Sequence, residues 1–160
     1  MVAIRTIQAS DNAKMKTIIQ SSLMANDLAI KGTAYFDPQL DYLSKYYDAE
    51  KYRHYFVAVD DSGELLGGAG VGEYDLDKKI AEFQKLYLSP NARGKGLSYQ
   101  LLDKTVEFAQ KEGYEQLYLE THHNLAPAIH IYEKYGFKAL ERPIKAGEHS
   151  AMDKFYILDL

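Results

Sequence analysis

The segment from Ile80 to Glu120 places the strongest constraint on the fold of this chain. It contains an extended run over Ile80–Leu88, a loop with two glycines, an amphipathic helix that ends near Gly113, and a second extended run over Gln116–Glu120. Two strands joined through a helix in this way lie parallel in one sheet, because the helix carries the chain back to the end of the sheet where the first strand began. The sequence therefore predicts a sheet with at least one parallel strand pair.

The extended runs before this unit are joined by turns alone. A cluster of Asp, Ser and Gly separates His54–Val59 from Leu65–Glu73, and a second polar cluster leads to Ile80–Leu88. This pattern favours an antiparallel meander. The glycines within Gly67–Gly72 lack the Gly-x-Gly-x-x-Gly spacing of a dinucleotide site, so they predict a strand that a ligand or another backbone passes closely.

Shorter elements complete the chain at both ends. Asp37-Pro38 predicts a helix start, with Asp37 as the capping carboxylate. The other predicted elements are a strand over Val2–Ile7, a helix from Asp11, a helix between Pro127 and Gly136, and strands over Phe137–Leu140 and Phe155–Leu160. No linker rich in Pro, Gly or Ser divides the chain, so we expect one domain over residues 1–160. The predicted class is α/β (α+β in some schemes), with a mixed, mostly antiparallel central sheet flanked by helices.

Composition excludes several classes of function. The chain has 160 residues and a net charge of −4, which argues against a nucleic-acid binder that needs a basic surplus. It has no cysteine, so disulfides, thiolate metal sites and a Cys nucleophile are excluded. No run reaches the roughly 18 apolar residues of a membrane span, and the first residues alternate instead of forming a signal-peptide core. We therefore expect a cytoplasmic protein that contacts no membrane.

The loop before the central helix has the features of an anion site. Arg93-Gly94-Lys95-Gly96 follows a strand and opens an amphipathic helix, and the small Ser98 lies in its first turn. Backbone N–H groups at a helix start are unpaired and carry the positive end of the helix dipole, and glycine lets an anion approach them closely. The loop predicts a phosphate or pyrophosphate site, although a solvated glycine turn would have the same spacing.

Two motifs carry a resemblance to a known family. Asn91-Ala92-Arg93-Gly94-Lys95-Gly96, within Ala81–Leu102, resembles the acetyl-CoA-binding loop Gln/Arg-x-x-Gly-x-Gly/Ala of the GNAT superfamily, except at Asn91. Ala128-Ile129-His130-Ile131-Tyr132-Glu133-Lys134-Tyr135-Gly136-Phe137 resembles the family's Ala-x-x-x-Tyr-Glu-Lys-x-Gly-Phe segment. An Asn often lies three residues before that Ala, and here Asn124 is one position away. The order of elements also matches the family fold.

The resemblance implies acetyl-CoA as co-substrate. In the family, the third meander strand splays from the following parallel strand, and pantetheine fills the gap. Backbone groups of Leu86, Tyr87 and Leu88 would then pair with pantetheine, and the N–H near Leu86 would polarise the thioester carbonyl. The remaining cofactor-binding residues implied by the motifs are Arg93, Gly94, Lys95, Gly96, Leu97 and Ser98 for the pyrophosphate, with Asn124 beside them.

The resemblance also implies the catalytic residues. Tyr132 matches the general acid that protonates the CoA thiolate, although its apolar helix would equally make it a core aromatic. Glu82 matches a base carboxylate used by some members, and an exposed strand Glu is the alternative. Because side chains alternate between the two faces of a strand, we expect Glu82 to share a face with Gln84 and Leu86. The rival carboxylates are Glu73 and Glu120.

Other polar groups lie where the acceptor would bind. His122 and His123 follow Glu120 at the carboxyl end of a strand, which suggests base or metal chemistry or simply solvated loop histidines. No third ligand stands at diagnostic spacing, so we expect no metal. The first two helices and their linker should form the acceptor pocket, with walls from Thr33-Ala34-Tyr35-Phe36-Asp37, Tyr42 and Tyr46. Packing of the second helix onto the sheet is the alternative role for these residues.

These inferences together predict an N-acetyltransferase that moves an acetyl group from acetyl-CoA directly to a primary amine of a small molecule or peptide. The alternatives are another acyl-CoA or a hydroxyl acceptor, and a non-catalytic module that senses acetyl-CoA. The sequence leaves the identity of the acceptor open. A homodimer is a further expectation from the resemblance.

Overall fold

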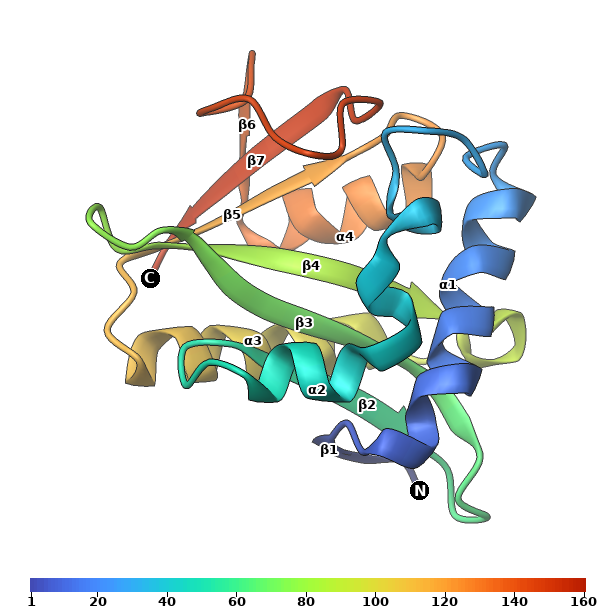
Figure 1. Ribbon diagram of the computed structural model, residues 1–160. Coiled ribbons are helices and arrows are strands. Elements are labelled where there is room, and N and C mark those ends of the chain that lie inside the picture. Colours follow the sequence, from blue (N-terminus) through green and yellow to red (C-terminus); the bar gives the residue numbers. More distant parts are fainter.

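A single mixed sheet organises the chain, and the computed structural model describes residues 1–160 of it (Figure 1). The sheet has seven strands in the order β1-β2-β3-β4-β5-β7-β6. Only β4 and β5 pair in parallel, and every other neighbouring pair is antiparallel. The strands are β1 (Ala3–Thr6), β2 (His54–Val59), β3 (Leu65–Asp75), β4 (Ile80–Leu88), β5 (Gln116–Thr121), β6 (Lys138–Leu140) and β7 (Lys154–Asp159). The predicted fold class is confirmed.

Helices cover both faces of the sheet (Figure 1). They are α1 (Asn12–Ala25), α2 (Leu43–Asp48), α3 (Leu97–Lys111) and α4 (Ala126–Tyr135). One hydrophobic core joins α1 and α2 to β2 through Met15, Leu43 and Val57, all fully buried. A second core joins α3 and α4 to the opposite face through residues such as Leu101, Leu117 and Tyr132. None of these helices combines the length and hydrophobicity needed to span a bilayer.

The parallel pair separates along its length. β4 pairs with β5 only from Ile80 to Glu82, opposite Gln116 to Tyr118. Beyond Tyr118, β5 is paired on its other edge alone, with β7. The side of β4 facing β5 therefore has no strand partner from Phe83 to Leu88, and the predicted splay is confirmed.

A bulge in β4 changes which side chains share a face. β3 pairs Gly68 with Tyr87 and Gly70 with Gln84, so β4 carries one extra residue at this point. Lys85 takes a φ of 52°, in the left-handed region that side chains rarely adopt. Glu82 and Gln84 keep the face covered by α1 and α2, whereas Leu86 packs against the core on the α3 and α4 side. The prediction that Leu86 shares a face with Glu82 was therefore wrong, because strict alternation ends at the bulge.

The glycines of β3 make room for two tyrosines and for β4. A Cβ on Gly67 would lie 2.3 Å from the carbonyl oxygen of Tyr87, and one on Gly70 would lie 2.6 Å from the Tyr55 ring. Tyr55 donates a hydrogen bond to the Lys85 carbonyl at 2.8 Å and so supports the bulge. The sequence predicted that a ligand or another backbone passes close to this strand. The structure confirms it: the β4 backbone and the rings of Tyr47 and Tyr55 lie against the glycines.

The α-helix predicted to start at Asp37-Pro38 begins later in the structure. The segment between α1 and α2 forms two 3-10 turns, Ala34–Phe36 and Pro38–Tyr42, before α2 begins at Leu43. Pro38 opens the second turn as expected, but the Asp37 side chain makes no capping hydrogen bond. Instead its carboxylate pairs with Lys85 and His149, which lie far away in the sequence. The capping role predicted for Asp37 was wrong, because the Lys85 ammonium and the His149 imidazole occupy its carboxylate oxygens.

Candidate functional site

The glycine loop meets the first turn of α3 in an open conformation. Gly94 and Gly96 both take a φ of 75°, and no atom lies within 4 Å of the position a Cβ would occupy on either. The backbone N–H groups that open α3 are therefore accessible to an anion. Arg93 stays close by, with its guanidinium 3.4 Å from the Ser22 hydroxyl, and Lys95 is exposed. Leu97 is buried in the core and anchors the helix start, so only its backbone faces the loop.

A cavity of about 240 Å³ extends from this loop between β4, the end of β5 and α4; we call it the loop cavity. Leu86, Tyr87 and Leu88 line it from β4, and Tyr132 lines it from α4. Arg93, Gly94 and Ser98 line it from the loop and α3. The structure thus brings these seven predicted residues to one cavity. Its position along the unpaired edge of β4 suits an extended chain that ends in an anion.

A second cavity, of about 300 Å³, lies beside it on the face covered by α1 and α2; we call it the carboxylate cavity. Four glutamates line it: Glu73, Glu82, Glu120 and Glu148. The two cavities share Phe83, Lys85, Tyr87, Glu120 and Met152 as lining residues. The opening between β4 and β5 therefore connects the glycine loop with a group of carboxylates.

Glu82 is held inside the carboxylate cavity by an amide relay. Gln84 donates a hydrogen bond to the Glu82 carboxylate at 2.9 Å, and Tyr47 donates to the Gln84 amide oxygen at 2.7 Å. Burial raises the pKa of Glu82 above its ordinary value of 4.5, the Gln84 hydrogen bond opposes the rise, and the charge of Glu120 adds to it. A carboxylate with a raised pKa is suited to accept a proton near neutral pH.

The two rival carboxylates have different surroundings. Glu73 is locked in a two-point salt bridge with Arg53, at 2.8 and 3.0 Å. The charge of Glu73 is therefore already neutralised by a fixed guanidinium. Glu120 accepts a hydrogen bond from the Tyr118 hydroxyl at 2.8 Å and pairs with no cation.

Tyr132 lies on the other side of the opening, on α4. Its ring packs edge-on against Phe83 and Phe137, and the residue is only 6% exposed. Burial raises the pKa of the Tyr132 hydroxyl above its ordinary value, and the nearby Tyr87 adds to the rise. Tyr132 is thus both a core aromatic and a cavity-lining hydroxyl that keeps its proton. The two roles weighed for it from the sequence are compatible.

Asn124 lies outside both cavities. Its side-chain amide donates to the Asn26 carbonyl at 2.9 Å and so joins the loop before α4 to the end of α1. Asn26 itself lines the loop cavity. Asn124 can therefore support the cavity wall, while its own amide nitrogen is occupied within the protein.

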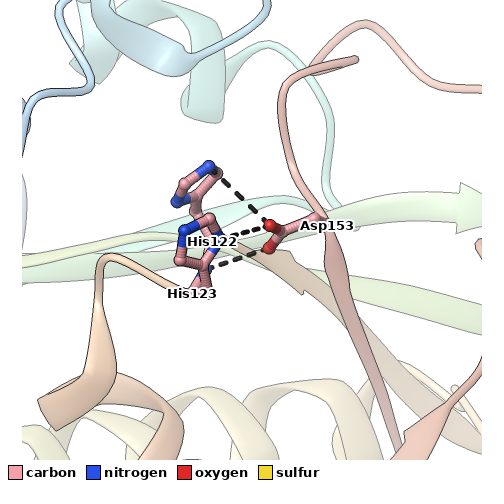
Figure 2. A group of neighbouring side chains, drawn as sticks. All are labelled: His122, His123 and Asp153. Carbon is pink, nitrogen blue, oxygen red and sulfur yellow. Dashed lines mark hydrogen bonds and ion pairs between the residues drawn. The ribbon is translucent and has the colours of Figure 1, made fainter.

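The adjacent histidines His122 and His123 lie beside Asp153, a residue that their spacing in the sequence did not indicate. Figure 2 shows the Asp153 carboxylate facing both imidazole rings, which stack with their centroids 4.2 Å apart. Asp153 accepts hydrogen bonds from the backbone N–H of His123, at 2.9 Å, and from its Nδ1. These bonds hold the pKa of Asp153 below its ordinary value, against the opposing effect of burial. The histidines are therefore anchored to the start of β7 and are not merely solvated.

The ligand atoms of His122, His123 and Asp153 lie within 4.8 Å of one another, and both histidines already hydrogen-bond within the protein. The Nδ1 atom of His122 accepts the Asn124 backbone N–H at 3.0 Å, so the proton of a neutral His122 must reside on Nε2. That Nε2 is the atom 3.8 Å from Asp153. The Nδ1 of His123 is likewise committed to the Asp153 carboxylate. The group fastens the β5–α4 turn to β7.

The predicted acceptor walls are only partly at the cavity. Ala34 and Tyr46 line the carboxylate cavity, whereas Phe36 and Tyr42 are exposed on the surface. The Thr33 hydroxyl donates to the carbonyls of Leu28 and Ile30 and is buried in the linker. The sequence prediction missed the segment between β6 and β7, which contributes Lys145, Gly147, Glu148 and His149 to the cavity. That segment has no periodicity, so the sequence held no local signal for its role.

Comparisons with known proteins agree on one family. A family model described as acetyltransferase (GNAT) family matches residues 21–137. The uncharacterized N-acetyltransferase YjgM of Escherichia coli strain K12 is 33% identical over 148 residues, which is 91% of this chain and 87% of that protein. The streptothricin acetyltransferase of Streptomyces lavendulae is 35% identical over 82 residues, 51% of this chain and 43% of that protein.

Solved structures share the fold over the whole chain. A GNAT-family acetyltransferase from Staphylococcus aureus Mu50 has a TM-score of 0.84 at 19% identity and covers 99% of both chains. A phosphinothricin acetyltransferase from Sinorhizobium meliloti, solved in complex with acetyl-CoA, has a TM-score of 0.77 at 22% identity, covering 99% of this chain and 88% of that one.

Proposed function

The chain belongs to the GNAT acetyltransferase family, and on that premise we propose that it transfers an acetyl group from acetyl-CoA directly to a primary amine of a small molecule or peptide. One observation carries the proposal. The glycine loop at the start of α3 opens into the loop cavity, which passes the unpaired edge of β4 and reaches Glu120. Glu120 also lines the carboxylate cavity, which contains Glu82.

The loop suits the pyrophosphate of coenzyme A. Gly94 and Gly96 need their left-handed backbone to turn the first N–H groups of α3 outward, and the space around them is open. Arg93 and Lys95 add positive charge to the helix dipole. The acetyl-CoA present in the Sinorhizobium meliloti neighbour supports the same ligand for this chain.

The splayed edge of β4 suits pantetheine and the thioester. Residues Leu86 to Leu88 line the loop cavity and have no strand partner on the side facing β5. Their backbone groups would pair with the extended pantetheine chain. A backbone N–H near Leu86 would polarise the thioester carbonyl, and one such donor contributes about 3 kcal/mol to stabilisation of the transition state.

Glu82 and Tyr132 supply the two proton transfers. Glu82, with its raised pKa, accepts the proton of the acceptor ammonium through a water molecule. The freed amine nitrogen then bonds to the carbonyl carbon as the carbon–sulfur bond breaks. Tyr132, which burial keeps protonated, donates its proton to the departing sulfur. The products are the N-acetylated amine and CoA.

Calorimetric titration with acetyl-CoA, CoA and ATP at fixed salt tests the cofactor. We expect tight binding of acetyl-CoA and weak binding of ATP. A panel of amino acids, polyamines, amine antibiotics and peptides, read by thiol release, then tests the reaction. Absence of acetyl-CoA binding by the folded protein would overturn the proposal. Binding without turnover of any amine would instead favour a module that senses acetyl-CoA.

A further inference from the structure

Glu120 occupies the junction of the two cavities. It lies near the carboxyl end of β5, and it is the one carboxylate that lines both the loop cavity and the carboxylate cavity. Glu82 and Tyr118 are register partners in the parallel pair, and Glu120 follows Tyr118 by two residues. Glu82, Tyr118 and Glu120 therefore project from the same face of the sheet.

The Glu120 carboxylate is held in place by a rigid partner. The Tyr118 hydroxyl donates to it at 2.8 Å. The Tyr118 side chain is fully buried, and its ring packs against Tyr74 with centroids 4.4 Å apart. Gly147 approaches from the segment before β7, where a Cβ would lie 3.6 Å from Glu120. Glu120 is thus oriented by Tyr118, which packs on Tyr74 of β3, and Gly147 leaves space beside the carboxylate.

The pair of Glu82 and Glu120 has no counter-ion of its own. Of the other acids around this site, Glu73 pairs with Arg53 and Asp37 pairs with Lys85, whereas Glu148 lines the cavity as an exposed side chain without an ion pair. Neither Glu82 nor Glu120 forms a salt bridge. Two carboxylates that face one cavity without a cation attract a cationic ligand.

We propose that Glu120, oriented by Tyr118, binds the ammonium group of the acceptor opposite Glu82. The inference rests on the proposed function and narrows it: the acceptor is an alkylamine that is protonated in neutral solution, and arylamines and alcohols are poor substrates. When Glu82 takes the proton, Glu120 stays beside the reacting nitrogen, held by the Tyr118 hydroxyl. Glu120 is then a binding residue, and Tyr118 is a positioning residue that acts through it.

The charges around Glu82 agree with this arrangement. Burial raises its pKa, and Glu120 raises it further, whereas His149 and Lys85 lower it. His149 faces the site from the β6–β7 segment, and Lys85 from the β4 bulge. Both of these side chains contact the Asp37 carboxylate.

The remaining titratable neighbours come from α2, β3 and the β6–β7 segment, which also contributes the exposed Glu148. Tyr46 lines the cavity under the Arg53 guanidinium, which is 4.3 Å from the centroid of its ring. Tyr47 reaches Glu82 through Gln84. Tyr74 lines the cavity beneath the ammonium of Lys145, which is 4.6 Å from the ring centroid. None of these groups places a cation within salt-bridge distance of Glu82 or Glu120.

The test compares Glu120→Gln and Tyr118→Phe with the wild-type chain in the thiol-release assay. The probes are lysine amide and cyclohexylamine, which are ammonium ions at neutral pH, and aniline, which is uncharged. We expect the wild type to favour the two ammonium probes.

Glu120→Gln should raise the KM of the ammonium probes about ten- to hundredfold, as for loss of a charge-assisted hydrogen bond, and change kcat much less. It should also move the acid limb of the rate profile to lower pH. Tyr118→Phe should raise the same KM by a smaller factor.

Asp103→Asn is the matched control. The Asp103 carboxylate accepts a hydrogen bond from Tyr135 at 2.7 Å, outside both cavities, so its loss should leave every KM unchanged. Unchanged KM for the ammonium probes in both Glu120→Gln and Tyr118→Phe would overturn the inference and leave the proposed function standing. Preference of the wild type for aniline would do the same. Failure to acetylate any amine would overturn the proposed function itself.

Discussion

The Lys85 ammonium lies 3.0 Å from the Asp37 carboxylate, with side chains only 6% and 10% exposed. His149 donates a hydrogen bond to the same carboxylate at 2.9 Å. Asp37 thereby ties three segments that are distant in sequence: the linker before α2, the bulge of β4 and the loop before β7. These segments enclose the carboxylate cavity, so this ion pair maintains the shape of the site.

Removing Asp37 should destabilise the fold strongly. Asp37→Asn leaves the buried Lys85 ammonium without a counter-ion, and breaking a buried pair in this way costs about 3–5 kcal/mol. Adding Lys85→Met to that variant removes the isolated charge and should recover most of the loss. Urea unfolding of the wild type, both single variants and the double variant gives the four free energies. Additive effects of the two substitutions would contradict a coupled pair.

The same carboxylate should make stability depend on acid pH. Burial alone would raise the pKa of Asp37, but the His149 hydrogen bond and the Lys85 charge outweigh burial and hold it below its ordinary value of 3.8. A carboxyl whose pKa is lower in the folded chain stabilises the fold above its unfolded pKa and loses that contribution as the pH falls. We expect the free energy of unfolding to decrease below about pH 4. The decrease should be smaller in Asp37→Asn, and an equal decrease in both proteins would assign it to other acids.

The regular part of the fold was predictable because its signals are local. Alternation and flanking turns placed β2 and β4 at their observed bounds, His54–Val59 and Ile80–Leu88. Gly113 and Gly136 ended their helices with positive φ, as expected for residues without a Cβ. Family motifs then predicted seven of the residues that line the loop cavity, whereas the predicted Lys95, Gly96, Leu97 and Asn124 lie outside its lining.

The remaining features depend on contacts between distant residues. Lys85 adopts a left-handed backbone although its side chain disfavours it, because Tyr55 holds its carbonyl and Asp37 holds its ammonium. Asp153 lies 30 residues from His123 in the chain, and no spacing rule links the two. Such pairings are decided by tertiary packing, which alternation and motifs do not describe.

Glu82→Gln should lower kcat/KM at neutral pH by about 10²-fold, because the general base is lost. In the wild type, kcat/KM should rise with pH through a limb whose midpoint lies above 4.5, since burial raises the pKa of Glu82. The variant should lack that limb. It should also unfold at no lower urea concentration, because Gln removes a carboxyl that is costly to ionise when buried. An acid limb that persists in Glu82→Gln would point to Glu73, Glu120 or His122.

Tyr132→Phe should lower kcat by about 10²-fold through loss of the general acid. The affinity for acetyl-CoA should change little, because the ring and its packing against Phe83 are retained. Tyr156→Phe is the control: Tyr156 is buried beside Tyr132, but its hydroxyl donates to Glu133 outside both cavities. Single-turnover measurement of both variants isolates the chemical step. A Tyr132→Phe rate within about twofold of the wild type would remove Tyr132 from the mechanism.

Gly94→Asp should abolish measurable acetyl-CoA binding while the fold persists. A carboxylate at the start of α3 would compete with the pyrophosphate for the same N–H groups and repel its charge. Gly113→Asp is the matched control, because Gly113 ends the same helix with a φ of 90° and equally open surroundings. The two substitutions impose similar backbone strain, so a loss of binding confined to Gly94→Asp reports the loop's contact with the anion. Equal affinity in both variants would mean that coenzyme A binds away from the start of α3.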